Sequence, residues 1–305
     1  MPFLTLFSTP KAFTNPHIAM IQKNAIQSWK QLGKDVKIIL VGEDMGVKKA
    51  AKELGVQLIS EIARNVQGTP LISSIFDAGN SLNASPLLAY INSDIIVLPD
   101  FLETARQISV KLEKFLLVGQ RWDLDIWKTI PFNQGWQEKL NKEIKEKGRR
   151  HPPAGSDYFI YPRGCFQKIP DFAVGRAGWD NWMIFKARWE GWKTIDASEA
   201  ITIIHQSHDY YHLPEGKAHY RLPESKENGR LAGGKTTVFT LQDANFFVQH
   251  HTLKKKSFTL KRFLRAFEVW PLTSLHSTAL ARFMYCIYHP IKAYRELRNG
   301  NTALL

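Results

Sequence analysis

The sequence predicts an α/β fold in which a mostly parallel central sheet is flanked by helices, and three observations support this. Residues 36–41 (VKIILV) form a continuous apolar run that ends at Gly42, as is typical of a strand buried on both faces of a parallel sheet. Residues 17–32 place apolar side chains at helical spacing. Segments of these two kinds alternate along the chain, which favours strand-helix-strand units with right-handed crossovers.

Each further element has its own local signal. A helix at 47–54 is closed by Gly55, and Pro70 suits the first turn of a helix that runs through residue 82. The charged segment 137–150 is expected to form a solvated helix and loop, with a candidate role as a lid. The remaining expected elements are strands at 3–8, 56–59, 87–91, 95–98, 115–119, 158–161 and 201–204 and a helix at 180–192.

The composition fits one large globular domain. The chain has 305 residues, of which 44% are hydrophobic and 23% are charged, as expected for a globular protein. Only Cys165 and Cys286 are present, and their separation argues against a disulfide scaffold, a zinc ribbon and a CxxC redox site. Residues 1–9 do not have the form of a signal peptide, and no run reaches the roughly 18 apolar residues of a membrane span. We therefore expect a water-soluble, cytoplasmic protein.

The C-terminal part differs in charge from the rest. We expect a catalytic domain at 1–250 and a basic, amphipathic helical tail at 251–305, because from Lys254 onwards ten Lys or Arg residues stand against two Glu. Residues 258–294 mix aromatic and aliphatic side chains with basic ones, which favours peripheral contact with an acidic membrane surface. Packing against the catalytic domain or against a second subunit is the alternative.

Polar residues stand where expected strands end, which is the edge at which parallel α/β sheets bind their ligands. Asn92, Ser93 and Asp94 interrupt the apolar stretch 87–98. A carboxylate at this place can hold Mg²⁺ or Mn²⁺ against a diphosphate and stabilise the charge of the leaving group. The alternative is a turn between two short strands, stabilised by Asn and Asp side chains.

A set of short motifs in a fixed order carries a resemblance to a known superfamily. The segments FLTLFST, VKIILVGED, RNVQGTPLISSIF, YINSDIIVLPDF and VGRAGWDNWMIF resemble, in this order, the GT-A nucleotide-diphospho-sugar transferases, in particular family-2-like glycosyltransferases. The resemblance covers residues 3–210. It implies a GT-A, Rossmann-like fold and an inverting, metal-assisted transfer of a sugar from a nucleotide-sugar donor. A glycan, lipid-linked or other hydroxyl compound would be the acceptor, and no nucleic acid partner is expected.

The resemblance also assigns roles at the donor site. Asn92, Ser93 and Asp94 occupy the place of the family's DxD triplet, with Asn for the first Asp and with Asp94 as the ligand of Mn²⁺ or Mg²⁺. In the H-x-x-H pair, His208, or else His205, resembles the late histidine that completes the metal shell in some GT-A enzymes. The implied nucleotide-binding residues are Thr9, Glu43, Asp44, Arg64, Asn65, Thr69, Asn92 and Ser93.

A second carboxylate is the candidate for proton transfer. Asp180 resembles the catalytic base of inverting GT-A enzymes, which takes the proton of the acceptor hydroxyl as its oxygen attacks the anomeric carbon. The alternative for Asp180 is a helix N-cap. Trp179 is a candidate for stacking on an acceptor sugar, and Asp157 for the wall of the acceptor pocket. Their alternatives are core packing and a turn or strand-edge position.

Two other functions compete with glycosyl transfer. A sugar-phosphate nucleotidyltransferase would have the same fold, but the opening segment FSTPKAF lacks the Gly-rich phosphate loop that such enzymes usually carry. A non-enzymatic module that binds nucleic acid or acidic lipid would explain the basic tail. It would leave Asp94 and Asp180 without a role.

Overall fold

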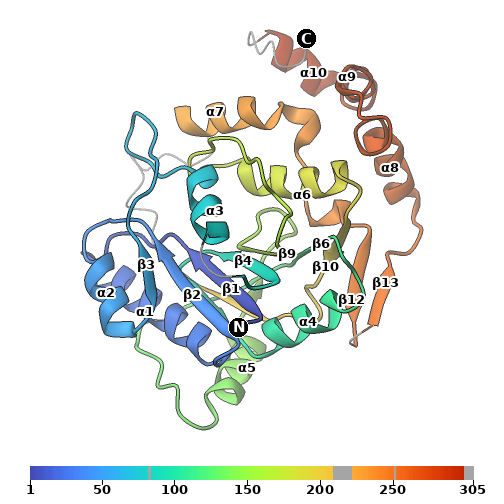
Figure 1. Ribbon diagram of the computed structural model, residues 1–305. Coiled ribbons are helices and arrows are strands. Elements are labelled where there is room, and N and C mark those ends of the chain that lie inside the picture. The colour runs from blue at the N-terminus through green and yellow to red at the C-terminus, as the bar shows by residue number, and fades with distance from the viewer. Residues whose placement is uncertain (82–83, 209–221, 251, 299–305) are drawn as a thin grey trace.

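A computed structural model describes residues 1–81, 84–208, 222–250 and 252–298, and it confirms the α/β class with a mostly parallel central sheet (Figure 1). The large sheet has nine strands in the order β13-β12-β10-β6-β9-β4-β1-β2-β3. Its strands are β1 (Leu4–Ser8), β2 (Val36–Val41), β3 (Gln57–Ile59), β4 (Leu87–Ile91), β6 (Phe115–Val118), β9 (Tyr158–Pro162), β10 (Lys193–Asp196), β12 (Phe246–Gln249) and β13 (Thr252–Lys255). Strand β9 runs antiparallel to its neighbours β4 and β6, and β13 runs antiparallel to β12.

Helices cover both faces of this sheet (Figure 1). The helices are α1 (Pro16–Lys30), α2 (Val47–Leu54), α3 (Ile72–Ser81), α4 (Asp100–Ser109), α5 (Trp136–Lys147), α6 (Trp179–Trp189), α7 (Pro223–Ala232), α8 (Leu260–Thr273), α9 (Thr278–Tyr288) and α10 (Pro290–Arg298). On one face, Trp29 of α1 and Phe101 of α4 pack with alternate residues of the strands. On the other face, Phe76 of α3 and Met183 of α6 do the same. Residue 82, the expected end of α3, lies outside the described residues.

A second, smaller sheet explains the polar interruption at 92–94. It has the order β5-β11-β7-β8 and comprises β5 (Ile95–Val97), β7 (Trp122–Leu124), β8 (Arg149–Arg150) and β11 (Ile203–Gln206). Because β4 belongs to the large sheet and β5 to the small one, residues 92–94 form the turn at which the chain passes between them. Helix α5, in the segment expected to be a solvated helix and loop, packs Trp136, Leu140 and Ile144 against the small sheet.

The C-terminal segment contacts the α/β core in two ways, through a strand and through helix packing. Strand β13 lies beyond the expected boundary at residue 250 and pairs with β12, so the large sheet extends into the segment expected to be a tail. Beyond β13, Val269 and Leu272 of α8 and Ala281 of α9 join the core on the α6 side. Residues 251 and 299–305 of that segment lie outside the described residues. None of the described helices is both long enough and apolar enough to cross a membrane.

Candidate active site

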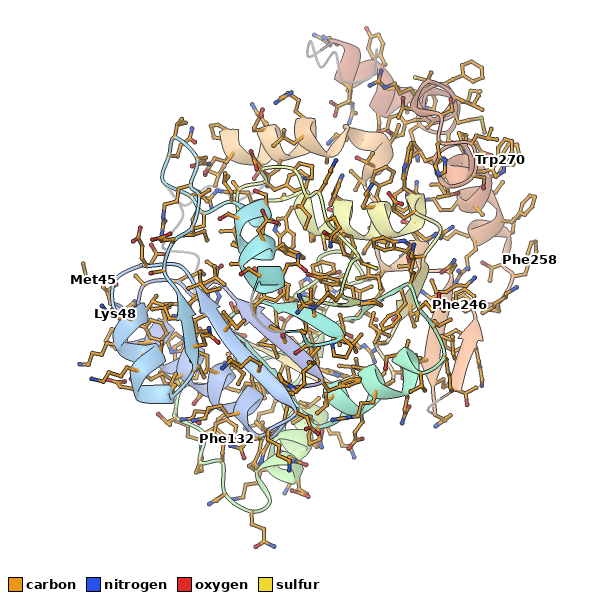
Figure 2. The ribbon with its side chains drawn as sticks, viewed as in Figure 1. Met45, Lys48, Phe132, Phe246, Phe258 and Trp270 are labelled. Carbon is orange, nitrogen blue, oxygen red and sulfur yellow. The ribbon has the colours of Figure 1, made fainter. Side chains whose placement is uncertain are left out.

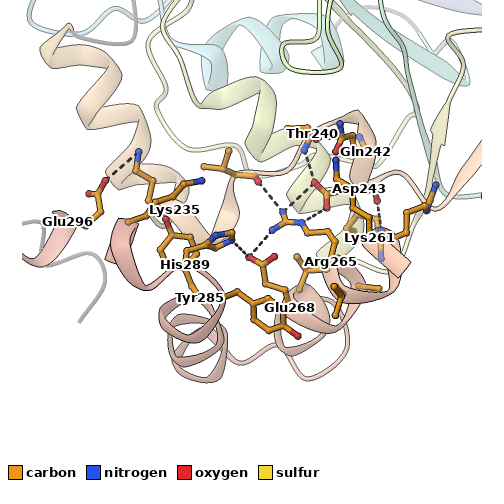
Figure 3. Close-up of a pocket in the computed structure, with 18 of the residues that line it drawn as sticks. Lys235, Thr240, Gln242, Asp243, Lys261, Arg265, Glu268, Tyr285, His289 and Glu296 are labelled. Atoms are coloured by element: carbon orange, nitrogen blue, oxygen red, sulfur yellow. Dashed lines mark hydrogen bonds and ion pairs between the residues drawn. The ribbon is translucent and has the colours of Figure 1, made fainter. Parts of the chain in front are cut away.

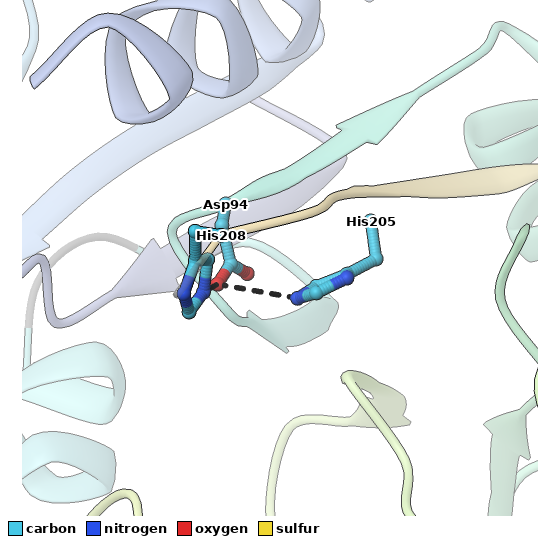
Figure 4. A group of neighbouring side chains, drawn as sticks. All are labelled: Asp94, His205 and His208. Atoms are coloured by element: carbon cyan, nitrogen blue, oxygen red, sulfur yellow. Dashed lines mark hydrogen bonds and ion pairs between the residues drawn. The ribbon is translucent and has the colours of Figure 1, made fainter. Parts of the chain in front are cut away.

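Asp94, His205 and His208 converge at the turn between the two sheets (Figure 4). Each offers one potential ligand atom, and these three atoms lie within 4.8 Å of one another. His208 Nε2 lies 3.0 Å from Asp94 Oδ2, and His205 Nε2 lies 3.7 Å from the same oxygen. The antiparallel pairing of β11 with β5 sets His205 opposite Ile95, directly after Asp94. A carboxylate and two imidazoles are a donor set that suits Mn²⁺ and related divalent ions.

The charge state of Asp94 fits a cation ligand. Burial raises the pKa of this carboxyl, but the hydrogen bond with His208 and the charges of His205 and Lys11 outweigh burial and hold the pKa well below its usual value. The carboxylate is therefore ionised at neutral pH. Its Oδ1 atom is buried and has no hydrogen-bond partner among the described residues. A buried anionic oxygen without a donor is costly, and a bound cation would satisfy it.

Asp123 of β7 lies beside His205. Its Oδ1 lies 3.2 Å from His205 Nδ1 without forming a well-aligned hydrogen bond, and its Oδ2 lies 3.0 Å from His151 Nδ1. Arg121 Nε donates to Asp123 Oδ1 at 2.8 Å and keeps the carboxylate in place. His205 thus has Asp123 near its Nδ1 and Asp94 near its Nε2, and metal-binding imidazoles commonly have a second carboxylate on the nitrogen that does not bind the ion. From the sequence, Asp123 is a candidate for the wall of an acceptor pocket and not for a place beside these histidines, because local patterns do not reveal that β7 pairs with β11.

Asn92 and Ser93 hold the turn that carries Asp94. Asn92 donates through its backbone N–H to the carbonyl oxygen of Asp157 at 2.9 Å and through Nδ2 to Asp157 Oδ1 at 2.8 Å. Its own Oδ1 accepts a bond from the Tyr90 hydroxyl at 3.2 Å. Ser93 Oγ donates to Gln22 Oε1 at 2.9 Å. Both side chains, expected to contact the nucleotide, thus have protein partners that fix the backbone directly before Asp94.

Asp157 is buried and engaged on both oxygens. Arg121 Nη1 lies 2.9 Å from Oδ1 and 2.9 Å from Oδ2, in addition to the bond from Asn92. Arg121 therefore bridges Asp157 and Asp123. The sequence placed Asp157 at the wall of an acceptor pocket, whereas its contacts tie the β4–β5 turn to the start of β9.

Asp180 lies in the first turn of α6, next to Asp157. The N-cap of α6 is Gly178, so Asp180 does not occupy the cap position that was its alternative role. Burial raises the pKa of the Asp180 carboxyl above its usual value, and the charge of Asp157 raises it further, against backbone hydrogen bonds from Asn181 and Ser156. A carboxylate with a raised pKa is a stronger base than an ordinary aspartate, which suits proton abstraction.

Trp179 belongs to the core. It is 5% exposed, and its ring meets Tyr90 and Phe159 edge to face, with centroids 5.2 and 5.5 Å apart. This corresponds to the core-packing alternative, because a ring buried on these sides offers no open face to a sugar.

The expected nucleotide-binding loop lies beside a cavity of about 570 Å³ that Arg64 and Asn65 line together with Glu224 of α7. Arg64 Nη2 pairs with Asp44 Oδ1 at 3.1 Å, and Asn65 Nδ2 donates to Glu224 Oε1 at 2.7 Å. Asn65 Oδ1 accepts the backbone N–H of Thr69 at 2.9 Å and so shapes the loop. The cavity is large enough for a nucleoside.

The other two expected nucleotide ligands occupy different surroundings. The Thr9 hydroxyl follows β1, is buried, and has no hydrogen-bond partner among the described residues. Glu43 is exposed after β2. A free buried hydroxyl next to a strand end is a group that a ligand can satisfy.

Two cations near the metal cluster received no role from the sequence. Burial lowers the pKa of the Lys11 ammonium, the charge of Asp94 raises it, and the charge of Arg176 lowers it, so the three groups act on one another. Arg176 Nε donates to Glu224 Oε2 at 2.6 Å, and Glu224 also accepts from Asn65, so Arg176 is connected to the loop of Arg64 and Asn65. Lys11 lies in FSTPKAF and Arg176 in VGRAGWDNW, both of which were quoted motifs, but Glu224 carries no motif at all.

Comparisons with known proteins give matches at the level of structure. No family model matches the sequence, and no curated protein matches it. A mannosyltransferase from Pyrobaculum calidifontis, solved with GDP-Man and Mn²⁺, matches 69% of this chain at 10% identity and a TM-score of 0.45. The match covers 58% of the length of that mannosyltransferase. The glucosyl-3-phosphoglycerate synthase of M. tuberculosis matches 85% of this chain, over 89% of its own length, at 14% identity and a TM-score of 0.47.

Proposed function

We propose that this protein is an inverting, metal-assisted glycosyltransferase that moves a sugar from a nucleoside-diphosphate sugar to an acceptor hydroxyl. The observation that carries the proposal is the convergence of Asp94, His205 and His208 around the unsatisfied Asp94 Oδ1. A second carboxylate, Asp180, has a raised pKa, in part because the charge of Asp157 acts on it. Asp157 is also the residue to which Asn92 donates a hydrogen bond.

The donor would bind across two linked subsites. Asp94, His208 and His205 would hold Mn²⁺ or Mg²⁺, and the ion supplies positive charge to the diphosphate as it leaves. Lys11 and Arg176 add two further cations beside the metal cluster. The base and ribose would occupy the neighbouring cavity and the ends of β1 and β2, where the expected contacts are Thr9, Glu43, Asp44, Arg64, Asn65 and Thr69.

Asp180 acts as the general base. Its carboxylate accepts the proton of the acceptor hydroxyl while that oxygen forms a bond to the anomeric carbon. The bond between the anomeric carbon and the diphosphate oxygen breaks on the opposite side, so the configuration at that carbon inverts. The charge of Asp157 raises the pKa of Asp180 and so strengthens the base. The acceptor is a glycan, a lipid-linked sugar or another hydroxyl compound, and the free cysteines Cys165 and Cys286 fit a reducing cytoplasm.

The test is thermal unfolding with a panel of nucleoside diphosphates, each with and without Mn²⁺ or Mg²⁺. A ligand that binds only the folded state raises Tm, by an amount that corresponds to about 2.7 kcal/mol at 100 times its Kd. We expect one nucleotide to raise Tm in a metal-dependent manner and to be released when its sugar conjugate is incubated with acceptor mixtures. No shift with any nucleotide at saturating metal would overturn the proposal.

A further inference from the structure

Helix α8 turns an apolar face to solvent. Leu260, Phe263 and Phe267 follow one another at helical spacing, and their side chains are 68%, 52% and 51% exposed. Figure 2 shows Phe258 and Trp270 at the outer edge of the molecule, on the side away from the sheet. Val269 and Leu272, on the opposite side of α8, are buried in the core. The helix is therefore apolar on its outer face as well as on its inner one.

Helices α9 and α10 also carry exposed apolar side chains. Phe283, Ile287 and Ile291 are spaced by four residues and are 61%, 57% and 68% exposed. Among the described residues, eleven of the seventeen large apolar side chains that are exposed lie at 258–294. We call these eleven side chains the tail face, although one of them, Leu264, also borders an inner cavity. Exposed apolar side chains gathered in one segment indicate an interaction site, whereas single exposed apolar residues are ordinary.

Charged side chains of the tail point inward instead and fix its orientation. Arg265 Nε donates to Asp243 Oδ1 at 2.7 Å, and its Nη1 lies 3.0 Å from Glu268 Oε1 (Figure 3). His289 Nε2 lies 3.0 Å from the same Glu268 oxygen, and Arg262 Nη2 donates to the carbonyl oxygen of Ala244 at 3.1 Å. These contacts border a cavity of about 1000 Å³ beneath the helices. Ion pairs and hydrogen bonds on the inner side of α8 and α9 thus fix which side of these helices faces outward.

The net positive charge of the tail indicates an anionic partner. Glu268 and Glu296, the acidic residues of the tail, both have basic partners, since Glu296 lies 3.7 Å from Lys235 Nζ. Lys261, Lys292 and Arg295 are exposed and also border the cavity of about 1000 Å³. A second copy of the chain would bring like charges together across the contact, which is unfavourable. An anionic lipid surface complements both the basic and the apolar side chains.

We propose that the tail face docks the protein on an anionic membrane surface, with its aromatic side chains between lipid headgroups and acyl chains. The exposed basic residues of α8 and α10 then supply positive charge that attracts the anionic headgroups. The helices lie along the surface and do not span the bilayer, in keeping with their length and charge. This inference stands on the tail alone and does not depend on the proposed sugar transfer.

Co-sedimentation with vesicles tests the proposal on the full chain. One set of vesicles is phosphatidylcholine alone, and the other is phosphatidylcholine mixed with phosphatidylglycerol. We expect binding to the anionic set that weakens with added salt and that is at least about tenfold stronger than to the neutral set. The triple variant Phe263→Ser, Phe267→Ser and Phe283→Ser should lose this binding. The double variant Val66→Ser and Val110→Ser, at exposed apolar positions outside the tail, should retain it.

A charge variant and an oligomer measurement complete the test. Lys261→Gln combined with Lys292→Gln should weaken binding by about fivefold per removed charge. All substituted side chains are exposed, so each variant should keep the Tm of the unmodified chain. Wild-type protein that binds neither set of vesicles would overturn the proposal. Concentration-dependent dimers in sedimentation velocity that the triple variant abolishes would also overturn it and would assign the tail face to self-association.

Discussion

Asn92 donates two hydrogen bonds to Asp157, one from its backbone N–H to the carbonyl oxygen at 2.9 Å and one from Nδ2 to Oδ1 at 2.8 Å. Asn92 stands two residues before Asp94, the central residue of the candidate metal cluster. Asp157 in turn raises the pKa of Asp180, the proposed base. A single residue pair therefore links the two carboxylates to which the proposed mechanism assigns different tasks.

Replacing Asp180 by Asn should separate catalysis from donor binding. The substitution nearly preserves shape but removes the proton acceptor, so we expect the turnover number to fall by about 10²- to 10⁴-fold. The nucleotide-induced rise in Tm should be retained. The measurement is product formation by mass spectrometry, with Asp77→Asn as the control, since Asp77 is an exposed carboxylate of α3. Unchanged turnover in Asp180→Asn would limit this residue to a structural role in α6.

The rate of transfer should depend on pH through Asp180. The base acts in its deprotonated form, and its pKa is raised by burial and by the charge of Asp157, so the rate should fall on acidification at a pH above that typical of aspartate. Asp157→Asn keeps an acceptor oxygen for Asn92 but removes the charge. The acidic limb of its pH-rate profile should therefore move to lower pH. An acidic limb at the same pH in the variant and the wild type would show that Asp157 does not change the pKa of the catalytic base.

Asp94→Asn should abolish the metal-dependent part of nucleotide binding. The variant lacks the anionic Oδ1, which has no other partner among the described residues, and it can no longer pair with His208 as a charge. Thermal shifts with nucleotide should become the same with and without Mn²⁺. Asp77→Asn serves again as the matched control and should keep the difference. Persistence of metal dependence in Asp94→Asn would place the ion elsewhere.

Asn92→Asp, which creates a D-x-D sequence, should destabilise the fold rather than improve the metal site. The new carboxylate cannot donate to Asp157 Oδ1 and faces a like charge, so we expect a loss of about 1–3 kcal/mol of unfolding free energy at neutral pH. Urea denaturation measures this loss. The deficit should shrink at acidic pH, where a protonated Asp can donate again. A variant that is as stable as the wild type and binds metal more tightly would contradict the expectation.

Asp100 should make stability fall between about pH 4 and pH 6. Burial raises the pKa of this α4 residue from 3.8 to about 6 in the folded protein. In that window the folded state holds more protons than the unfolded state, so stability decreases as pH rises. Asp100→Asn should remove up to about 3 kcal/mol of this pH dependence. The difference in Tm between pH 8 and pH 4 should therefore be more favourable to pH 8 in the variant than in the wild type. Equal pH dependence in both proteins would show that Asp100 titrates normally.

The sequence determined the positions of many strands and helices and the residues at several strand ends, although α4, β7, β10 and β12 were not among the expected elements. Apolar runs such as 36–41 predicted strands because both faces of the sheet are covered, and helical spacing at 17–32 predicted α1. The resemblance added Asp94 and one histidine, His208 or else His205, as candidate metal ligands, whereas the structure brings all three together. These features depend on local periodicity and on the rule that ligands meet at strand ends, so neighbouring residues suffice to reveal them.

Only the tertiary structure decided which of these residues meet. Arg121 reaches Asp157 over 36 positions and Asn65 reaches Glu224 over 159, and such partners follow from the order of the strands, which local periodicity does not encode. The structure also buried the ring of Trp179. In the tail, the sequence set the helical spacing of apolar and basic residues. Packing of Val269 and the ion pair of Arg265 with Asp243 decided which side faces outward, because a helix with apolar residues on two sides can bury only one.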